Sequence, residues 1–225
     1  MAKAPFKHPS VFVACPYTPA ATFKAFRDAL KRVPLEFHYA DSAIKTAYVM
    51  ERIRRGIVRC DYSMFDITDW NANVTLELGL AEGLNKDYYI LFKPGRGKKA
   101  DPPSDIKGLQ RIQYIQIDGF GEDCLEYQLN HQLVRRLTHP RYVYDQLSGA
   151  NREKAFIVAM RMLAHFKEHK LLHRRDMQPL VAGSYLRDDA VEELLGVLRD
   201  RGLLTGRLDG QKWKAGRSLY KRVTF

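Results

Sequence analysis

Residues 61–83 read DYSMFDITDWNANVTLELGLAEG. The first part, residues 62–68, is a short run of aromatic and aliphatic side chains, which predicts a buried β-strand. Two polar residues, Asp66 and Thr68, lie at the C-terminal end of that run. A buried strand followed directly by a helix is the repeating unit of parallel α/β sheets. This stretch therefore predicts a strand, a turn and a helix of an α/β fold.

The second part of the stretch predicts a helix over residues 74–84. Leucine recurs at the four-residue spacing of a helix face packed on a sheet: Leu76, Leu80 and Leu84. Asn73 is the expected N-cap. Glu77 then falls about one turn inside the helix, where the positive end of the macrodipole would keep its carboxylate ionised.

An ionised Glu77 beside the ends of strands has two interpretations. Such a carboxylate is a usable nucleophile or a stabiliser of a developing cation. Alternatively, it only complements the helix dipole or pairs with a neighbouring arginine. The spacing of the residues leaves both interpretations open.

Strands and helices alternate on either side of this stretch. Strands are predicted at residues 11–14, 35–39, 62–68, 88–92 and 112–117, and helices at 21–32, 44–55, 74–84 and 125–137. This order predicts a flavodoxin-like, doubly wound parallel sheet, whose ligands lie beyond the carboxyl ends of the strands. Several polar or small residues fall at or just after those ends: Cys15, Pro16, Tyr17, Asp41, Asp66 and Thr68.

Three segments carry a family resemblance: VFVACPYTPA (11–20), DITDWNANVTLELGLAEG (66–83) and PPSDIKGLQRIQY (102–114). Over roughly residues 8–138 the chain resembles the nucleoside 2-deoxyribosyltransferase-like and TIR-like families. The resemblance implies a flavodoxin-like core, cleavage of an N-glycosidic bond, and a catalytic glutamate that falls on Glu77. Deoxyribosyltransferases usually carry acidic and small residues before that glutamate, whereas this chain has Asn71, Ala72 and Asn73. The difference favours the TIR-like branch, with NAD or a related nucleotide as the substrate.

The resemblance also implies roles for the candidate site residues. Glu77 would face the anomeric carbon and stabilise or attack the cationic ribose. Asp66, the second residue of the expected catalytic pair, would orient the ribose hydroxyls or the carboxylate together with Asn71 or Asn73, and Tyr17 would stack on the base. The remaining residues of the expected substrate-binding set are Cys15, Pro16, Asp41 and Thr68. This mechanism requires neither a cofactor nor a metal.

TIR-like and deoxyribosyltransferase-like domains fused to small modules resemble bacterial defence effectors. The resemblance implies that a partner or self-assembly into homo-oligomers completes the site. Two other functions stay open. One is hydrolysis or transfer of a nucleoside or deoxynucleotide ribosyl group, and the other is a nucleotide-sensing, DNA-binding regulator without turnover.

A second domain is predicted after the first. Pro140 and Gly149 break the periodicity, which places a linker at residues 141–151 between a domain at 1–140 and another at 152–225. Helices are predicted at 153–169, at 176–182 and from Asp188, followed by two strands. This order resembles a winged helix-turn-helix domain.

The winged-helix resemblance implies contacts with nucleic-acid phosphates through basic wing residues. Carried onto this chain, these are Lys212, Lys214, Arg217, Lys221 and Arg222. Four acidic residues near the start of the third helix fit a DNA groove poorly. Contact with a protein, self-assembly and backbone-only contact with DNA or RNA therefore all stay open.

Composition sets the outer bounds. The 225 residues carry a net charge of +11, of which residues 151–225 hold +7, and this excess fits a polyanionic partner. A hydrophobic content of 45% is enough for packed cores. No apolar run is long enough to cross a membrane and the N-terminus lacks a signal-peptide pattern, so a cytoplasmic protein without membrane contact is expected. The three separated cysteines suggest neither disulfides nor a metal motif.

Overall fold

The computed structural model describes residues 8–17, 19–39, 49–95, 108–147, 149, 151–205 and 212–215. Its first half is built on a five-stranded sheet in the order β2-β1-β3-β4-β5, with every neighbouring pair parallel. The strands are β1 (Ser10–Ala14), β2 (Glu36–Tyr39), β3 (Tyr62–Asp66), β4 (Tyr88–Phe92) and β5 (Arg111–Gln113). The predicted α/β class with a parallel sheet is confirmed, and the strand order is compatible with a flavodoxin-like fold.

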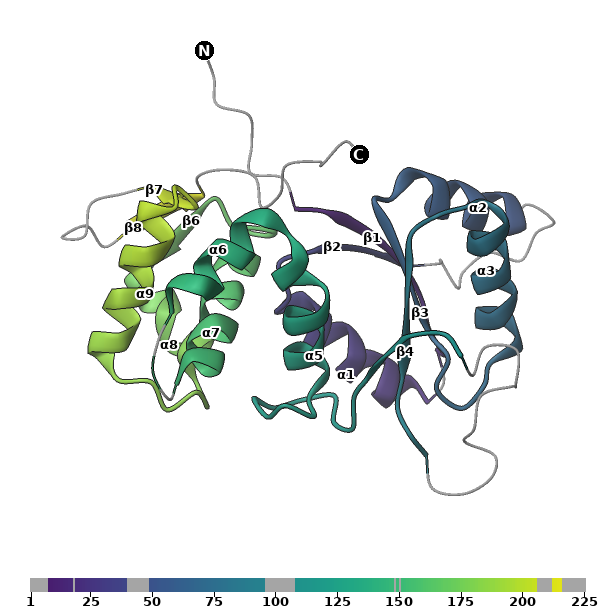
Figure 1. Ribbon diagram of the computed structural model, residues 1–225, viewed down its shortest axis with the longest axis horizontal. Coiled ribbons are helices and arrows are strands. Elements are labelled where there is room, and N and C mark those ends of the chain that lie inside the picture. The colour runs from purple at the N-terminus through teal and green to yellow at the C-terminus, as the bar shows by residue number, and fades with distance from the viewer. Residues whose placement is uncertain are drawn as a thin grey trace, which may run out of the picture.

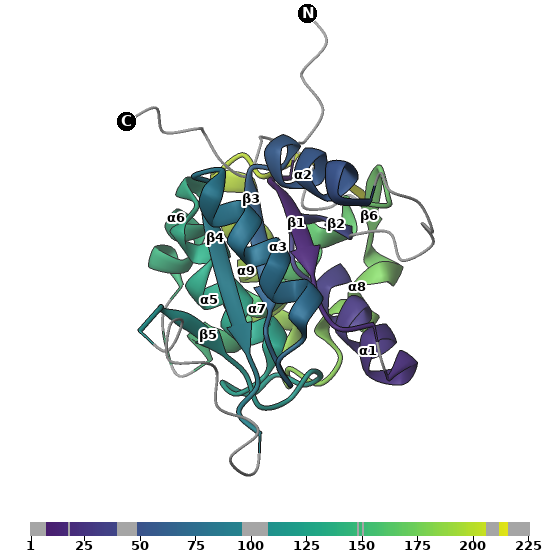
Figure 2. The same ribbon diagram turned by 90° about the vertical axis from the view of Figure 1, so that its right-hand side faces the viewer.

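Helices cover both faces of this sheet (Figures 1 and 2). On one face lie α1 (Ala20–Lys31) and α5 (Leu125–Gln132), and on the other lie α2 (Val49–Arg59) and α3 (Ala72–Gly83). Alternation along β1 explains the two layers, because Val11 and Val13 pack into the first core and Phe12 and Ala14 into the second. The sheet is therefore buried on both sides.

The structure corrects the start and the buried face of α3. The helix begins at Ala72, and the side-chain oxygen of its N-cap, Asn71, accepts hydrogen bonds from the backbone N–H groups of Asn73 and Val74. The residues buried against the sheet are Val74, Glu77, Leu78 and Ala81. Leu76 is 57% exposed, whereas Leu80 and Leu84 are partly buried and pack against the core, so only part of the predicted leucine stripe faces the sheet.

Two other element predictions differ from the structure. The helix expected at 44–55 begins partly outside the described residues, and α2 continues to Arg59. The last strand of the sheet was expected at 112–117, but β5 covers only Arg111–Gln113. After Tyr114 the chain leaves the sheet, and residue 116 pairs only with Cys124, through an isolated bridge.

The second half combines helices with a small antiparallel sheet. The helices are η2 (Val134–Arg136), α6 (Thr138–Gln146), α7 (Arg152–His165), η3 (Arg174–Asp176), α8 (Met177–Val181) and α9 (Asp188–Asp200). The strands β6 (Leu171–His173), β7 (Leu204–Thr205) and β8 (Lys212–Ala215) pair in the order β6-β8-β7. Helix α6 occupies much of the segment expected as a linker, and β6 was not predicted. The division into two domains stays a prediction.

One hydrophobic core joins the two halves. It runs from Val11 and Leu30 of the first half to Phe156, Leu195 and Trp213 of the second. Packing of α7 against α5, α6 and α9 connects these layers. No helix among the described residues is long and apolar enough to span a bilayer.

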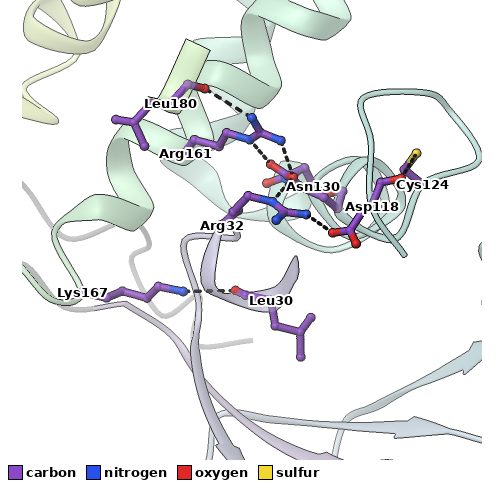
Figure 3. Close-up of polar contacts among 9 residues, drawn as sticks. Leu30, Arg32, Asp118, Cys124, Asn130, Arg161, Lys167 and Leu180 are labelled. Atoms are coloured by element: carbon purple, nitrogen blue, oxygen red, sulfur yellow. Dashed lines mark hydrogen bonds and ion pairs between the residues drawn. The ribbon is translucent and has the colours of Figure 1, made fainter. Parts of the chain in front are cut away.

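Polar contacts cross the same boundary (Figure 3). Glu126 of α5 is fully buried, and its carboxylate accepts hydrogen bonds from Arg161 of α7 and from Arg32, the C-cap of α1. Lys167 donates from Nζ to the carbonyl oxygens of Leu30 at 3.2 Å and Val33 at 2.7 Å. Burial lowers the pKa of Lys167 to about 7. The end of α1 is thus bonded directly to the second half.

Candidate active site

The carboxyl ends of the parallel strands form one edge of the sheet, and a cavity of about 330 Å³ opens there. Cys15 follows β1, Asp66 ends β3, and Lys93 and Tyr114 follow β4 and β5. All four residues line the cavity. Strand β1 has β2 on one side and β3 on the other, so the topological switch point lies between Cys15 and Asp66. Ligands of doubly wound sheets bind at such a point.

Asp66 is the polar centre of this edge. Its Oδ1 accepts hydrogen bonds from the backbone N–H and the hydroxyl of Thr68, and its Oδ2 accepts one from the Tyr114 hydroxyl at 2.8 Å. The Thr68 hydroxyl in turn accepts the backbone N–H of Lys93 at 2.9 Å. Burial raises the pKa of Asp66, although these hydrogen bonds oppose the shift. The network fixes the ends of β3, β4 and β5 relative to one another.

Glu77 occupies a core-facing position of α3. It is 8% exposed, and within the described ranges its carboxylate makes no hydrogen bond or ion pair. Burial raises its pKa from 4.5 to about 7. The macrodipole acts mainly on groups at the first turn of a helix. Because Asn71 is the N-cap, Glu77 is the sixth residue of α3 and lies beyond that turn. The expectation that the dipole holds Glu77 ionised is therefore wrong.

Cys15 lies close to both carboxylates. Burial raises the pKa of its thiol to about 12, and the negative fields of Asp66 and Glu77 add to that shift. Asp66 bonds Tyr114 in the core layer of α1, whereas Glu77 comes from α3 in the opposite layer. The two carboxylates therefore approach the end of β1 from opposite faces of the sheet. The lining of the 330 Å³ cavity itself comes from the α1 side.

The other predicted site residues have different surroundings. Pro16 and Thr68 line the cavity. Tyr17 packs its ring edge-on against Phe23 of α1, with centroids 4.9 Å apart, and Asn71 uses its side-chain oxygen as the helix cap. Asn73 is exposed on the first turn of α3. Asp41 lies outside the described residues.

The expected wing residues are described only in part. Lys212 and Lys214 are exposed on β8, on the face opposite the buried Trp213. This places the two ammonium groups on the solvent side of the small sheet. Arg217, Lys221 and Arg222 lie outside the described residues.

Sequence reasoning missed several residues that line the cavity, among them Lys93, Tyr114 and Asp69. Lys93 directly follows a predicted strand, so the rule that placed Cys15 at the site could have found it too. Tyr114 lies inside the strand predicted at 112–117 and follows only the shorter β5 of the structure. Asp69 has a φ of 57°, and the next residue, Trp70, has a φ of 49°. Two adjacent side chains in the left-handed region are unusual outside glycine and asparagine, and they mark a strained turn at the cavity.

Comparisons with known proteins add no assignment to this geometry. No protein-family model matches the chain, and a search of the curated proteins finds no similar sequence. Within the described ranges, no three histidine, cysteine or carboxylate side chains gather as metal ligands would.

Proposed function

We propose that this chain cleaves the N-glycosidic bond of NAD or a related nucleotide, with Glu77 as the catalytic carboxylate. The observation that carries the proposal is the buried position of Glu77, which lacks a polar partner among the described residues and lies near Cys15 and Asp66 at the switch point. A structural carboxylate in such a place would be paired, because burying an unpaired charge is costly. Buried acids with a raised pKa are typical of catalytic sites. Glu77 reaches the end of β1 from the α3 layer and is not among the described residues that line the 330 Å³ cavity.

The chemistry assigns the following roles. Loss of nicotinamide from NAD leaves positive charge on the ribose, which the ionised Glu77 stabilises or captures as a ribosyl ester. Water then attacks the anomeric carbon, releases the carboxylate and gives up a proton. Nicotinamide leaves as a neutral molecule, so no general acid is needed at the leaving group.

Asp66 has a positioning role in this proposal. Both of its oxygens already accept hydrogen bonds from Thr68 and Tyr114. Lys93 and Asp69 line the same cavity and are the remaining charged groups there for contact with a nucleotide. The nicotinamide ribose would lie over the end of β1, where Glu77 and Asp66 converge.

The test is release of the base by full-length protein. NAD, and in parallel a pool of nucleosides and deoxynucleotides, is incubated with wild type, Glu77→Gln and Glu82→Gln, with and without DNA. Glu82 is an exposed carboxylate on the same helix, so Glu82→Gln makes the same change in charge away from the sheet. Chromatography of the products should show nicotinamide with wild type and Glu82→Gln, and at least about 100-fold less with Glu77→Gln.

Other outcomes would change the assignment. Release from nucleosides or deoxynucleotides but not from NAD would favour a nucleoside hydrolase or deoxyribosyltransferase that uses the same carboxylate. Absence of release from every substrate, together with equal nucleotide affinity for wild type and Glu77→Gln, would overturn the enzymatic proposal.

A nucleotide sensor is the second candidate. The order helix, strand, helix, helix, strand, strand from α7 to β8 fits a winged-helix module, which we propose for residues 152–225. The shared core and the bonds from Lys167 and Arg161 would transmit a ligand-induced change at α1 to this module. Acidic residues open α9, at Asp188 and Asp189, so phosphate contact through Lys212 and Lys214 fits better than insertion of α9 into a groove.

A further inference from the structure

The second half contains a larger cavity, of about 620 Å³, between helices α8 and α9. Figure 1 shows these helices at the end of the molecule away from α2 and α3. This α8–α9 cavity shares no residue with the cavity at the strand ends. Its volume is within the roughly 300–1,000 Å³ of small-ligand sites.

Most of the lining of the α8–α9 cavity is apolar. The apolar side chains are buried or half-buried, and they come from both helices, from the loop between the helices and from β8: Met177, Val181, Leu186, Val191, Leu195 and Trp213. A ligand that displaces water from such a concave surface gains free energy through its own apolar area. The lining therefore fits the hydrocarbon or aromatic body of a small molecule.

The charged groups of the lining are two carboxylates and one guanidinium group, on Asp188, Glu192 and Arg174. Arg174 and Glu192 form an ion pair at 2.7 Å that joins η3 to α9, so their charges offset each other. Asp188 is exposed, and among the residues that the structure describes its carboxylate has no hydrogen bond or ion pair. This carboxylate is therefore available to a cationic group of a ligand.

The neighbouring carboxylate has a different setting. Asp188 and Asp189 both lie in the first turn of α9, where the helix dipole stabilises negative charge. Asp189, however, pairs with Arg187 at 3.0 Å and does not line the cavity. The dipole thus acts on both residues, but only Asp188 offers its charge to the cavity.

The loop between α8 and α9 places an aromatic ring at the rim of the cavity. Tyr185 lines the cavity although it is 89% exposed, and its φ is 58°, which is unusual for a tyrosine. Ser184 fixes this loop, because its hydroxyl donates to the carbonyl oxygen of Val181 at 2.7 Å and accepts the backbone N–H of Leu186 at 3.3 Å. The ammonium group of Lys154 lies 5.8 Å from the centroid of the Tyr185 ring. The rim therefore holds a fixed aromatic surface against which the body of a ligand can pack.

We propose that the α8–α9 cavity is a binding site for a small organic amine with an aromatic or branched apolar body. The apolar lining holds the body, and the carboxylate of Asp188 accepts a charge-assisted hydrogen bond from the ammonium group. The side-chain amide oxygen of Gln178, which also lines the cavity, accepts a second hydrogen bond. The excess of carboxylates over guanidinium groups disfavours an anion of the same shape. The site does not depend on the proposed glycosidase activity.

The test is calorimetric titration of full-length protein at pH 7 with three probes that share a phenyl ring and a four-carbon chain. The amine 4-phenylbutylamine is cationic, 4-phenylbutanol is neutral and 4-phenylbutyrate is anionic. Wild type is compared with Asp188→Asn and with the control Asp189→Asn. Both variants remove one negative charge from an exposed position in the same turn, so both should fold. In a Trp70→Phe background, the emission of Trp213 reports binding at the cavity that this residue lines.

We expect the amine to bind wild type and Asp189→Asn, and to bind Asp188→Asn at least about tenfold more weakly. Wild type should bind the amine at least about tenfold more tightly than 4-phenylbutyrate, with the alcohol between them, and the emission of Trp213 should change over the same concentration range. Because the net charge of +11 attracts anions in general, a preference for the cation identifies a local carboxylate.

A further control concerns the cavity at the strand ends. Asp69→Asn removes an exposed carboxylate of that cavity and should bind the amine as wild type does. The proposal is overturned if the amine does not bind, if the three probes bind equally, if Asp188→Asn and Asp189→Asn lose affinity equally, or if Asp69→Asn abolishes binding.

Discussion

Folding shifts the acid–base equilibrium of Glu77. The pKa of this carboxyl is 4.5 in an ordinary setting and about 7 in the folded chain, because α3 buries it against the sheet. Between these two values the unfolded chain releases a proton that the folded chain retains. The free energy of unfolding therefore falls as pH rises from 4.5 to 7, and the full penalty is present above pH 7. A site that tolerates this penalty gains a carboxylate that is poised near neutral pH.

We expect Glu77→Gln to stabilise the protein at pH 8. Glutamine keeps the shape of the side chain without its charge, so the variant should exceed wild type by up to about 3 kcal/mol in the free energy of unfolding. Near pH 4 the wild-type carboxyl is neutral in both states, and the difference should disappear. Urea unfolding at several pH values measures this dependence. A pH-independent difference between the two proteins would mean that burial does not shift the pKa of Glu77.

At the residue scale, sequence reasoning predicted which side chains gather at one edge of the sheet better than it predicted the setting of Glu77. The strand ends placed Cys15, Asp66 and Thr68 correctly at one edge, because parallel strands bring their carboxyl ends together. The ionisation of Glu77 was predicted wrongly, since it depended on which asparagine caps α3. Asn71 and Asn73 are both good caps, and only the folded backbone selects Asn71.

At the scale of single elements, the packing of α2 on β1 depends on one glycine. Gly56 meets the ring of Phe12, which is 2% exposed, at a distance that leaves no space for a Cβ atom. Gly79 of α3 is also within a helix, but it lies on an exposed face with no atom within 4 Å of such a Cβ. Neither glycine has a positive φ. Alanine substitutions at the two positions therefore distinguish the effect of helix propensity on stability from the effect of packing.

Gly56→Ala and Gly79→Ala should change stability in opposite directions. Alanine at Gly79 should stabilise the protein by about 0.5–1 kcal/mol through its better helix propensity. At Gly56 the same gain should be outweighed by overpacking against Phe12, with a net loss of about 1–2 kcal/mol. Thermal unfolding of both variants measures the difference. Stabilisation by Gly56→Ala would show that α2 moves away from β1 without cost.

The elements themselves were largely predictable from periodicity. Strands β1 and β4 are mostly apolar runs, and helices α1 and α2 carry clear apolar faces, so local pattern was enough. Strand β6 was missed because its three residues, Leu171–His173, are too few to show a period. The buried face of α3 was predicted only in part, because Leu80 and Leu84 pack against the core but Leu76 is exposed.

At the scale of the whole molecule, one cluster of charges joins the two halves. Glu126 lies between Arg32 at 2.7 Å and Arg161, whose two contacts are 2.5 Å and 2.7 Å. The guanidinium of Arg161 also lies over the ring of Phe120 at 3.9 Å. A linker was predicted from Pro140 and Gly149, but long-range pairing of this kind leaves no local pattern in the sequence. The shared core and these contacts make independent unfolding of the halves unfavourable.

We expect the chain to unfold in a single transition that Arg161→Met shifts as a whole. Methionine fills part of the space, but it leaves the fully buried carboxylate of Glu126 with Arg32 alone, so the free energy of unfolding should fall by about 3 kcal/mol. In a Trp70→Phe background, fluorescence reports only Trp213 of the second half, while circular dichroism reports the whole chain. The midpoints of the unfolding transitions followed by the two signals should shift together to lower urea concentration.

The matched control is Arg199→Met, which removes a surface pair with Asp200 and should change stability by less than about 0.5 kcal/mol. A second test of the same coupling is Glu126→Gln in the Arg161→Met background. Neutralising Glu126 should recover part of the lost stability, because part of the cost lies in a buried carboxylate that keeps only one of its two guanidinium partners, Arg32. If Trp213 fluorescence changed at lower urea than circular dichroism in the Trp70→Phe protein with Glu126 and Arg161 intact, the two halves would unfold separately and Glu126 would not couple them.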